Sequence, residues 1–158
     1  MSRLIKMIKK ILKVLSVLIF VIPILLIAGL YMICPIINDR VARMTARDII
    51  ELPLPEDTEL VESKSEAGKL AGNGNGMQYF GAILIKSGSS LDELSEYYGA
   101  YADNEWTYCV ANQESSAIQQ IEHPTVSFDT EINENGYYIV YSWGSYSGIA
   151  SEFDLRGY

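Results

Sequence analysis

Residues 14–34 read VLSVLIFVIPILLIAGLYMIC and form the longest apolar run of the chain. The run contains no charged residue, and Ser16 is its one clearly polar side chain. Because an α-helix rises about 1.5 Å per residue, this run is long enough to cross the roughly 30 Å hydrocarbon core of a bilayer. The sequence therefore predicts a transmembrane helix over residues 14–34.

The flanks of this run differ in charge. Residues 1–13 contain no acid, and their bases are Arg3, Lys6, Lys9, Lys10 and Lys13. The other flank carries Arg40, Arg43 and Arg47. Because Lys and Arg next to a span tend to stay in the cytoplasm, we expect residues 1–13 to be a basic cytoplasmic tail and the rest to be exported. The chain is then a single-pass protein of the cell membrane with an extracytoplasmic C-terminal domain.

A cleaved signal peptide is the alternative to an anchor that stays attached. Such a peptide has an apolar core of about 7–15 residues and a small-x-small cleavage site. Residues 14–34 are longer than that, and the bulky residues LYMI occupy positions 30–33. A lipoprotein signal would use Cys34, but the same bulky residues precede it. We therefore predict an uncleaved signal-anchor.

Residues 35–55 connect the span to the rest of the chain. Ile37, Val41 and Met44 repeat at helical spacing beside the three arginines. This pattern predicts a short amphipathic juxtamembrane helix whose arginines meet lipid phosphates. The prolines of LPLP at residues 52–55 favour an extended spacer. We expect the segment to be a stalk that holds the domain off the membrane.

Residues 56–158 are enough for one small domain. The domain is strongly acidic, because all but two of the 20 Asp and Glu residues of the chain lie from Glu51 onward. The bases there are Lys64, Lys69, Lys86 and Arg156. Nucleic acid rewards positive charge on its partners. We therefore expect no nucleic-acid partner.

The first half of the domain carries strand and helix signals. Residues 58–63 alternate weakly and predict a strand, and the apolar run 77–85 predicts a buried central strand. The loop AGNGNG at residues 71–76 lies between them. It lacks the Gly-Lys-Ser/Thr ending or G-x-G-x-x-G frame of a phosphate cradle, so we interpret it as a turn. Ser90 and Glu93 form a capping-box pattern and predict a helix that packs on the sheet.

The second half is read as mainly β. Residues 106–110 predict a third strand, whereas residues 116–121 fit either a strand or a short helix. Residues 124–130 and 137–143 flank the turn signal NENG and predict a hairpin. The predicted fold class is α+β, with an N-terminal transmembrane helix plus a small, mainly antiparallel sheet covered by one helix.

Two strings support an anchored, exported domain by resemblance. These are GNGNGMQYFGAILIKS at residues 72–87, within a similar region spanning 69–101, and PLPEDTE at residues 53–59. They resemble a group of small, uncharacterised single-pass membrane proteins of clostridia-like Gram-positive bacteria. The resemblance covers about half of the chain and implies no catalytic residue.

No set of residues predicts a catalytic, cofactor or metal site. His123 is the one histidine, and lone histidines are mostly structural. Cys34 lies at the membrane boundary and Cys109 in a predicted strand, so we expect neither a disulfide between them nor a zinc site. Arg156 is expected to pair with an acidic neighbour or to tie down the C-terminal segment.

A calcium loop is also not expected. Residues 129–133, DTEIN, resemble the opening of an EF-hand loop. However, Glu134 occupies the glycine position of that loop, and Val140 occupies its final carboxylate position.

Two functions from different classes fit these features. We expect a membrane-anchored extracytoplasmic binding or interaction module, such as an accessory subunit of a cell-envelope complex, rather than an enzyme. Its partners would be the lipid bilayer, through the N-terminal helix, and an envelope protein or ligand. The alternative is a small cell-envelope hydrolase, in which two carboxylates face one cleft roughly 5–9.5 Å apart.

Overall fold

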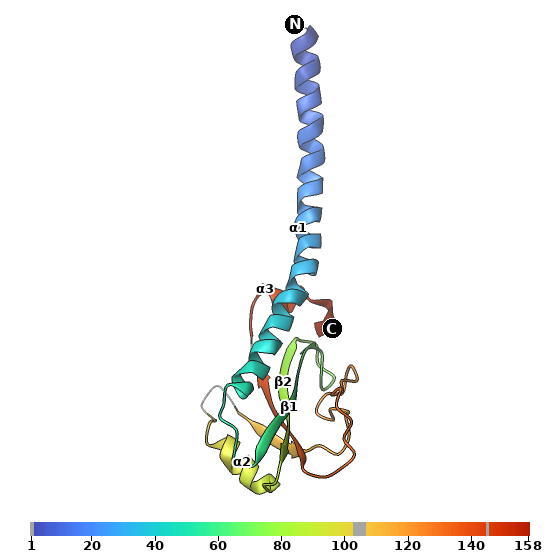
Figure 1. Cartoon of the computed structure of the whole chain (residues 1–158). Helices are drawn as coiled ribbons and strands as arrows, with labels where there is room; N and C mark the ends of the chain where they lie inside the picture. Colours follow the sequence, from blue (N-terminus) through green and yellow to red (C-terminus); the bar gives the residue numbers. More distant parts are fainter. Residues whose placement is uncertain (1, 103–106, 145) are drawn as a thin grey trace.

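The protein is built from one long N-terminal helix and a small sheet domain at its C-terminal end (Figure 1). The computed structural model describes residues 2–102, 107–144 and 146–158. Within these ranges the sheet has four strands, all antiparallel to their neighbours. The predicted α+β class with an N-terminal helix is confirmed.

The sheet has the order β1-β2-β4-β3. Its strands are β1 (Thr58–Gly68), β2 (Gln78–Ser87), β3 (Cys109–Asn112) and β4 (Tyr137–Gly144). β1 and β2 form a hairpin around the glycine-rich loop, as the sequence predicted. The side-chain amide of Gln78 closes this loop, because its oxygen accepts from the N–H groups of Leu70 and Ala71, both at 2.7 Å.

The hairpin predicted from residues 124–130 and 137–143 is wrong. β4 does form, but it pairs with β2 and β3. Residues 124–130 contribute an isolated bridge between Ala117 and Ser127 instead of a strand, and residues 116–121 form no regular element. β4 pairs with β2 in a register that places the buried Val140 opposite the buried Ile83. β3 starts at Cys109, and Trp106 lies outside the described residues.

Both faces of the sheet are covered. On one face, the second half of α1 (Ser2–Ile50) lies beside α2 (Leu91–Gly99), which begins with the predicted capping box. The side chains packed there are Ile49, Ile83, Ile85, Leu94, Tyr98 and Val140. The irregular segment 113–132 covers the other face, where the main apolar contacts involve Phe80, Leu84, Ile118, Phe128 and Ile139. The predicted covering helix, α2, is therefore joined by a second one.

Residues 35–50 are part of this core, which differs from the predicted stalk. They continue α1 without a break and pack on β1, β2 and β4. The packing face is formed by small and polar side chains together with one isoleucine: Cys34, Asn38, Ala42, Thr45, Ala46 and Ile49. Of the predicted apolar stripe, Ile37 and Met44 point outward and are 38% and 53% exposed, whereas Val41 is half-buried against the core.

Two glycines explain why small side chains form the contact. Gly81 of β2 and Gly144 of β4 lie directly beneath α1. A Cβ atom added at Gly81 would overlap the backbone of Thr45 and Ala46, and one added at Gly144 would overlap the Thr45 side chain. The helix backbone therefore rests almost on the strands, where larger side chains have no room.

Residues 5–28 of α1 extend away from the sheet domain (Figure 1). The described side chains of residues 5–28 are all exposed, and Phe20 is 71% exposed. The helix contains a strongly apolar stretch, and none of that stretch is buried. The first half of α1 is therefore long and apolar enough to cross a membrane.

Replacing Gly81 tests the close contact between α1 and the sheet. We expect Gly81→Ala to lower the free energy of unfolding by about 1–3 kcal/mol, because the added methyl group pushes the helix off the strands. The measurement is thermal unfolding of the detergent-solubilised full chain, followed by circular dichroism. Gly88→Ala is the matched control, because no atom lies within 4 Å of a Cβ atom at that position. Equal stability of the two variants would contradict the close contact.

Candidate functional site

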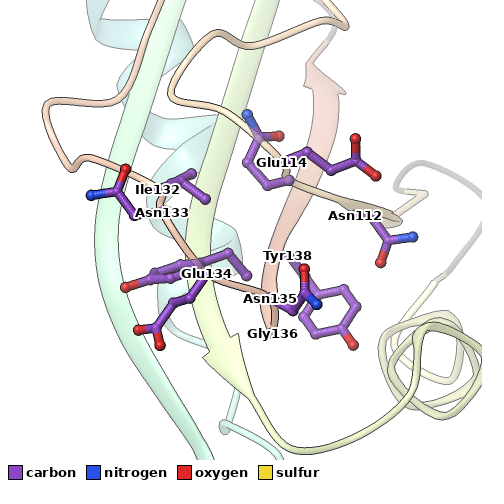
Figure 2. Close-up of a pocket in the computed structure, with 10 residues that line it drawn as sticks. Asn112, Glu114, Ile132, Asn133, Glu134, Asn135, Gly136 and Tyr138 are labelled. Carbon is purple, nitrogen blue, oxygen red and sulfur yellow. The ribbon is translucent and has the colours of Figure 1, made fainter.

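A polar pocket, drawn in Figure 2, lies beside the end of β2 and the start of β4. This end of the sheet is remote from the free half of α1 (Figure 1). β2 begins beside α1, where Tyr79 donates to Asn38, and it ends at Ser87, whose N–H donates to Gly136 at 2.9 Å. The pocket has a volume of about 490 Å³. It is lined by Asn112, Gln113, Glu114, Ile132, Asn133, Glu134, Asn135, Gly136, Tyr137 and Tyr138.

Backbone and side-chain hydrogen bonds fix the two walls of this pocket. The N–H of Gln113 donates to the carbonyl of Tyr137 at 3.0 Å, which joins the end of β3 to the start of β4. The buried side-chain amide of Gln113 donates to Ser115 and Ala117 at 2.7 and 2.8 Å. The pocket therefore has a defined frame, although turns supply most of its lining.

The two carboxylates of the pocket do not face each other. Figure 2 shows Glu114 and Glu134 on opposite sides, with their carboxylates pointing apart. Glu134 accepts a hydrogen bond from Lys86, which raises the pKa of the lysine, and the Lys86 ammonium lies 5.3 Å from the centre of the Tyr137 ring. This pocket therefore does not present a facing pair of carboxylates.

Amide groups dominate what the pocket offers to a ligand. Asn112, Asn133 and Asn135 each carry a donor and an acceptor. A second hollow of about 590 Å³ shares Asn135 and Gly136 and extends the polar surface towards Lys86 and Asp57. This chemistry suits a neutral, polar ligand or a polar loop of a partner protein. Among the described residues, no group of three His, Cys, Asp or Glu side chains is placed to hold a metal ion.

A second polar cluster lies at the opposite end of the domain, and we call it the C-terminal clamp. It consists of Asn38, Tyr79, Asp154 and Arg156. The buried amide of Asn38 donates to Asp154 at 2.8 Å and to the carbonyl of Ala150 at 2.9 Å, and it accepts from Tyr79 at 2.9 Å. Arg156 binds Asp154 and Asp39, both at 2.7 Å. Arg156 therefore holds the C-terminal segment against α1, as the sequence predicts.

The electrostatics of the clamp favour its charged form. Burial alone would raise the pKa of Asp154, but the hydrogen bonds from Arg156 and Asn38 outweigh it and hold this pKa below its usual value. The hydrogen bond to Asp154 raises the pKa of Arg156 in turn. Burial raises the pKa of Tyr79 to about 12, so its hydroxyl stays protonated and can donate. With these hydrogen bonds made, the clamp has a structural role.

The remaining candidates from the sequence lie apart from one another. His123 is exposed on the irregular segment, and Cys34 and Cys109 are both free cysteines. In the stretch resembling an EF-hand, Asp129 is drawn to the sheet, because its N–H donates to Glu62 at 2.9 Å and its carboxylate pairs with Lys64 at 3.2 Å. Burial raises the pKa of Glu62, but hydrogen bonds from Asp129 and Thr130 outweigh it and lower this pKa overall.

Sequence reasoning did not identify the pocket. The sequence predicts a turn at residues 133–136, and the chain bends there, but the asparagines of this segment also line the pocket. The opposite wall is formed by residues 112–114, where β3 ends and the irregular segment begins. The cluster of asparagines in one turn was the available signal, since each adds a polar side chain that the turn itself does not require.

Comparison of the chain with family models, with curated proteins and with solved structures finds no match. We therefore infer its function from the geometry of the chain itself.

Two tyrosine hydroxyls provide a matched test of the clamp. Tyr79 and Tyr98 are both buried, but the hydroxyl of Tyr98 has no hydrogen-bond partner in the described part of the chain. We expect Tyr79→Phe to cost about 1–3 kcal/mol, because it strands the buried oxygen of Asn38, whereas Tyr98→Phe should cost nothing. Urea unfolding of the two variants measures the difference. Equal stabilities would show that the hydrogen bond from Tyr79 to Asn38 contributes nothing to the free energy of unfolding.

Proposed function

We propose that this chain is a membrane-anchored extracytoplasmic binding module that presents its polar pocket away from the membrane. The observation that carries the proposal is the division of α1 into two halves. The first half is apolar and exposed, and the second half forms part of the domain core. An apolar helix of this length is stable in a bilayer, where its backbone groups are satisfied internally.

Retention of the anchor is supported by the same helix. The domain begins to bury side chains of α1 at Cys34, the last residue of the apolar run, and the clamp holds Asn38. No unpacked segment separates the two halves, so a protease would have to cut within a continuous helix. The basic residues 1–13 support a cytoplasmic N-terminus by the positive-inside tendency.

The binding role is supported by the position and chemistry of the pocket. It lies at the end of β2 that is remote from the anchor, and its polar lining consists of four amide side chains, two tyrosines and the carboxylates of Glu114 and Glu134. A partner in the cell envelope, such as another subunit of a complex, would meet this end of the domain first. The pocket is rich in side chains that make neutral hydrogen bonds, and such bonds confer specificity at interfaces.

The topology is tested with a cysteine at each end of the molecule. In a Cys109→Ala background, where the remaining Cys34 is buried, we expect Asn133→Cys to react with a membrane-impermeant maleimide on intact cells. Lys6→Cys is the control and should react only after the cells are permeabilised. Labelling is read by a mass shift on a gel. The reverse pattern would invert the proposed orientation.

The binding role is tested by crosslinking through the pocket. A photoreactive amino acid at position 133 should give a discrete crosslinked product on intact cells, because the side chain at this position lines the pocket. Thr125 is the matched control position, since it is exposed but lies outside the pocket lining. If positions 133 and 125 gave the same products, or none, the pocket would not be the binding surface.

A further inference from the structure

We infer that the C-terminal segment, residues 149–158, is a collar that inserts apolar side chains into the interface of the bilayer crossed by α1. The collar comprises α3 (Ile149–Glu152), the short helix η1 (Leu155–Gly157) and the residues adjoining them. The inference rests on the proposed anchor. It goes beyond that proposal by assigning a second membrane contact to the folded domain, which removes the predicted stalk.

Hydrogen bonds and one ring contact fix the position of the collar along α1. Ala150 accepts from Asn38 at 2.9 Å, and the guanidinium of Arg156 donates to the carbonyl of Pro35 at 3.1 Å. The ring of Phe153 lies 5.9 Å from that of Tyr31 in an edge-on contact. The collar therefore lies beside residues 31–39 of α1, at the end of the domain from which the free half of the helix leaves (Figure 1).

This position coincides with the expected edge of the hydrocarbon core. No charged residue occurs between Lys13 and Asp39. If the core begins after Lys13, then about 20 residues of helix cross its roughly 30 Å and bring the far boundary to about residue 33. Tyr31 then lies where aromatic residues are enriched in membrane proteins. The collar occupies the layer immediately outside.

The side chains of the collar fit that layer. Ile149, Leu155 and Tyr158 are 67%, 69% and 58% exposed, although they belong to a folded segment with a buried polar clamp behind it. Arg156 is neutralised between Asp39 and Asp154. Exposed aliphatic and tyrosine side chains gain free energy when they move from water into the headgroup boundary. The bilayer is therefore the occupant that this apolar surface fits.

The same geometry revises the expected role of Arg47, the arginine of α1 that lies farthest from the apolar run. Arg47 follows Tyr31 by 16 positions, which corresponds to roughly 24 Å along a helix. The headgroup layer is only about 5–8 Å thick on each side of the hydrocarbon core. Arg47 instead pairs with Glu51 at 2.6 Å. Arg47 thus lies beyond the headgroup layer, whereas the collar lies within it.

Depth-dependent fluorescence quenching tests the collar in the full chain. An environment-sensitive fluorophore is attached to a cysteine at position 149 or 155, in the Cys109→Ala background, after reconstitution into phosphatidylcholine nanodiscs. We expect lipids that carry a spin label near the headgroup to quench both positions. Position 133, in the remote pocket, is the matched control and should keep its emission. Position 20, in the centre of the apolar run, reports on the anchor through lipids labelled deep in the chain.

The outcomes separate the collar from the anchor. Quenching at positions 149, 155 and 20, but not at position 133, supports the collar. Quenching at position 20 alone overturns the collar and leaves the anchor intact, whereas no quenching at position 20 overturns the anchor as well. A blue-shifted emission at positions 149 and 155 without quenching by lipid would place a second copy of the protein on this surface, and it would also overturn the collar.

Discussion

The close contact between α1 and the two central strands determines how the rest of the molecule is arranged. Gly81 and Gly144 lie on neighbouring strands, and they let Thr45 and Ala46 approach the sheet to backbone distance. This approach makes the second half of α1 a core element. The height and orientation of the domain relative to the free half of the helix then follow, because one continuous helix links them.

Features with a local cause could be predicted from the sequence. The apolar run 14–34, the β1–β2 hairpin and the capping box of α2 each depend on residues that are close in sequence. The packing face of α1 could not be predicted in this way. It is made of Cys34, Asn38, Ala42 and Thr45, whose small or polar side chains do not form an apolar stripe in the sequence. Their burial depends on glycines and on a clamp that lie far away in the chain.

The same distinction applies to the candidate site. The turn at residues 133–136 was predicted, but the strand that follows it pairs with β2 rather than with the preceding segment. An Asn-Gly signal specifies a reversal of the chain and does not specify the partner strand. The pocket arises because β3 and β4 pair at their ends and bring residues 112–114 beside that turn. A pairing between segments so far apart leaves no local pattern in the sequence.

Because α1 is unbroken, a tilt of its first half is transmitted to the whole domain. Membrane helices adjust to bilayer thickness by tilting, on average by about 20°. Such a tilt would carry the far end of a strand roughly 30 Å long sideways by about 10 Å. In a protein with a flexible linker, the linker would absorb this tilt and the domain would not follow it. Here, with α1 as the proposed membrane anchor, bilayer thickness would set the direction in which the pocket points.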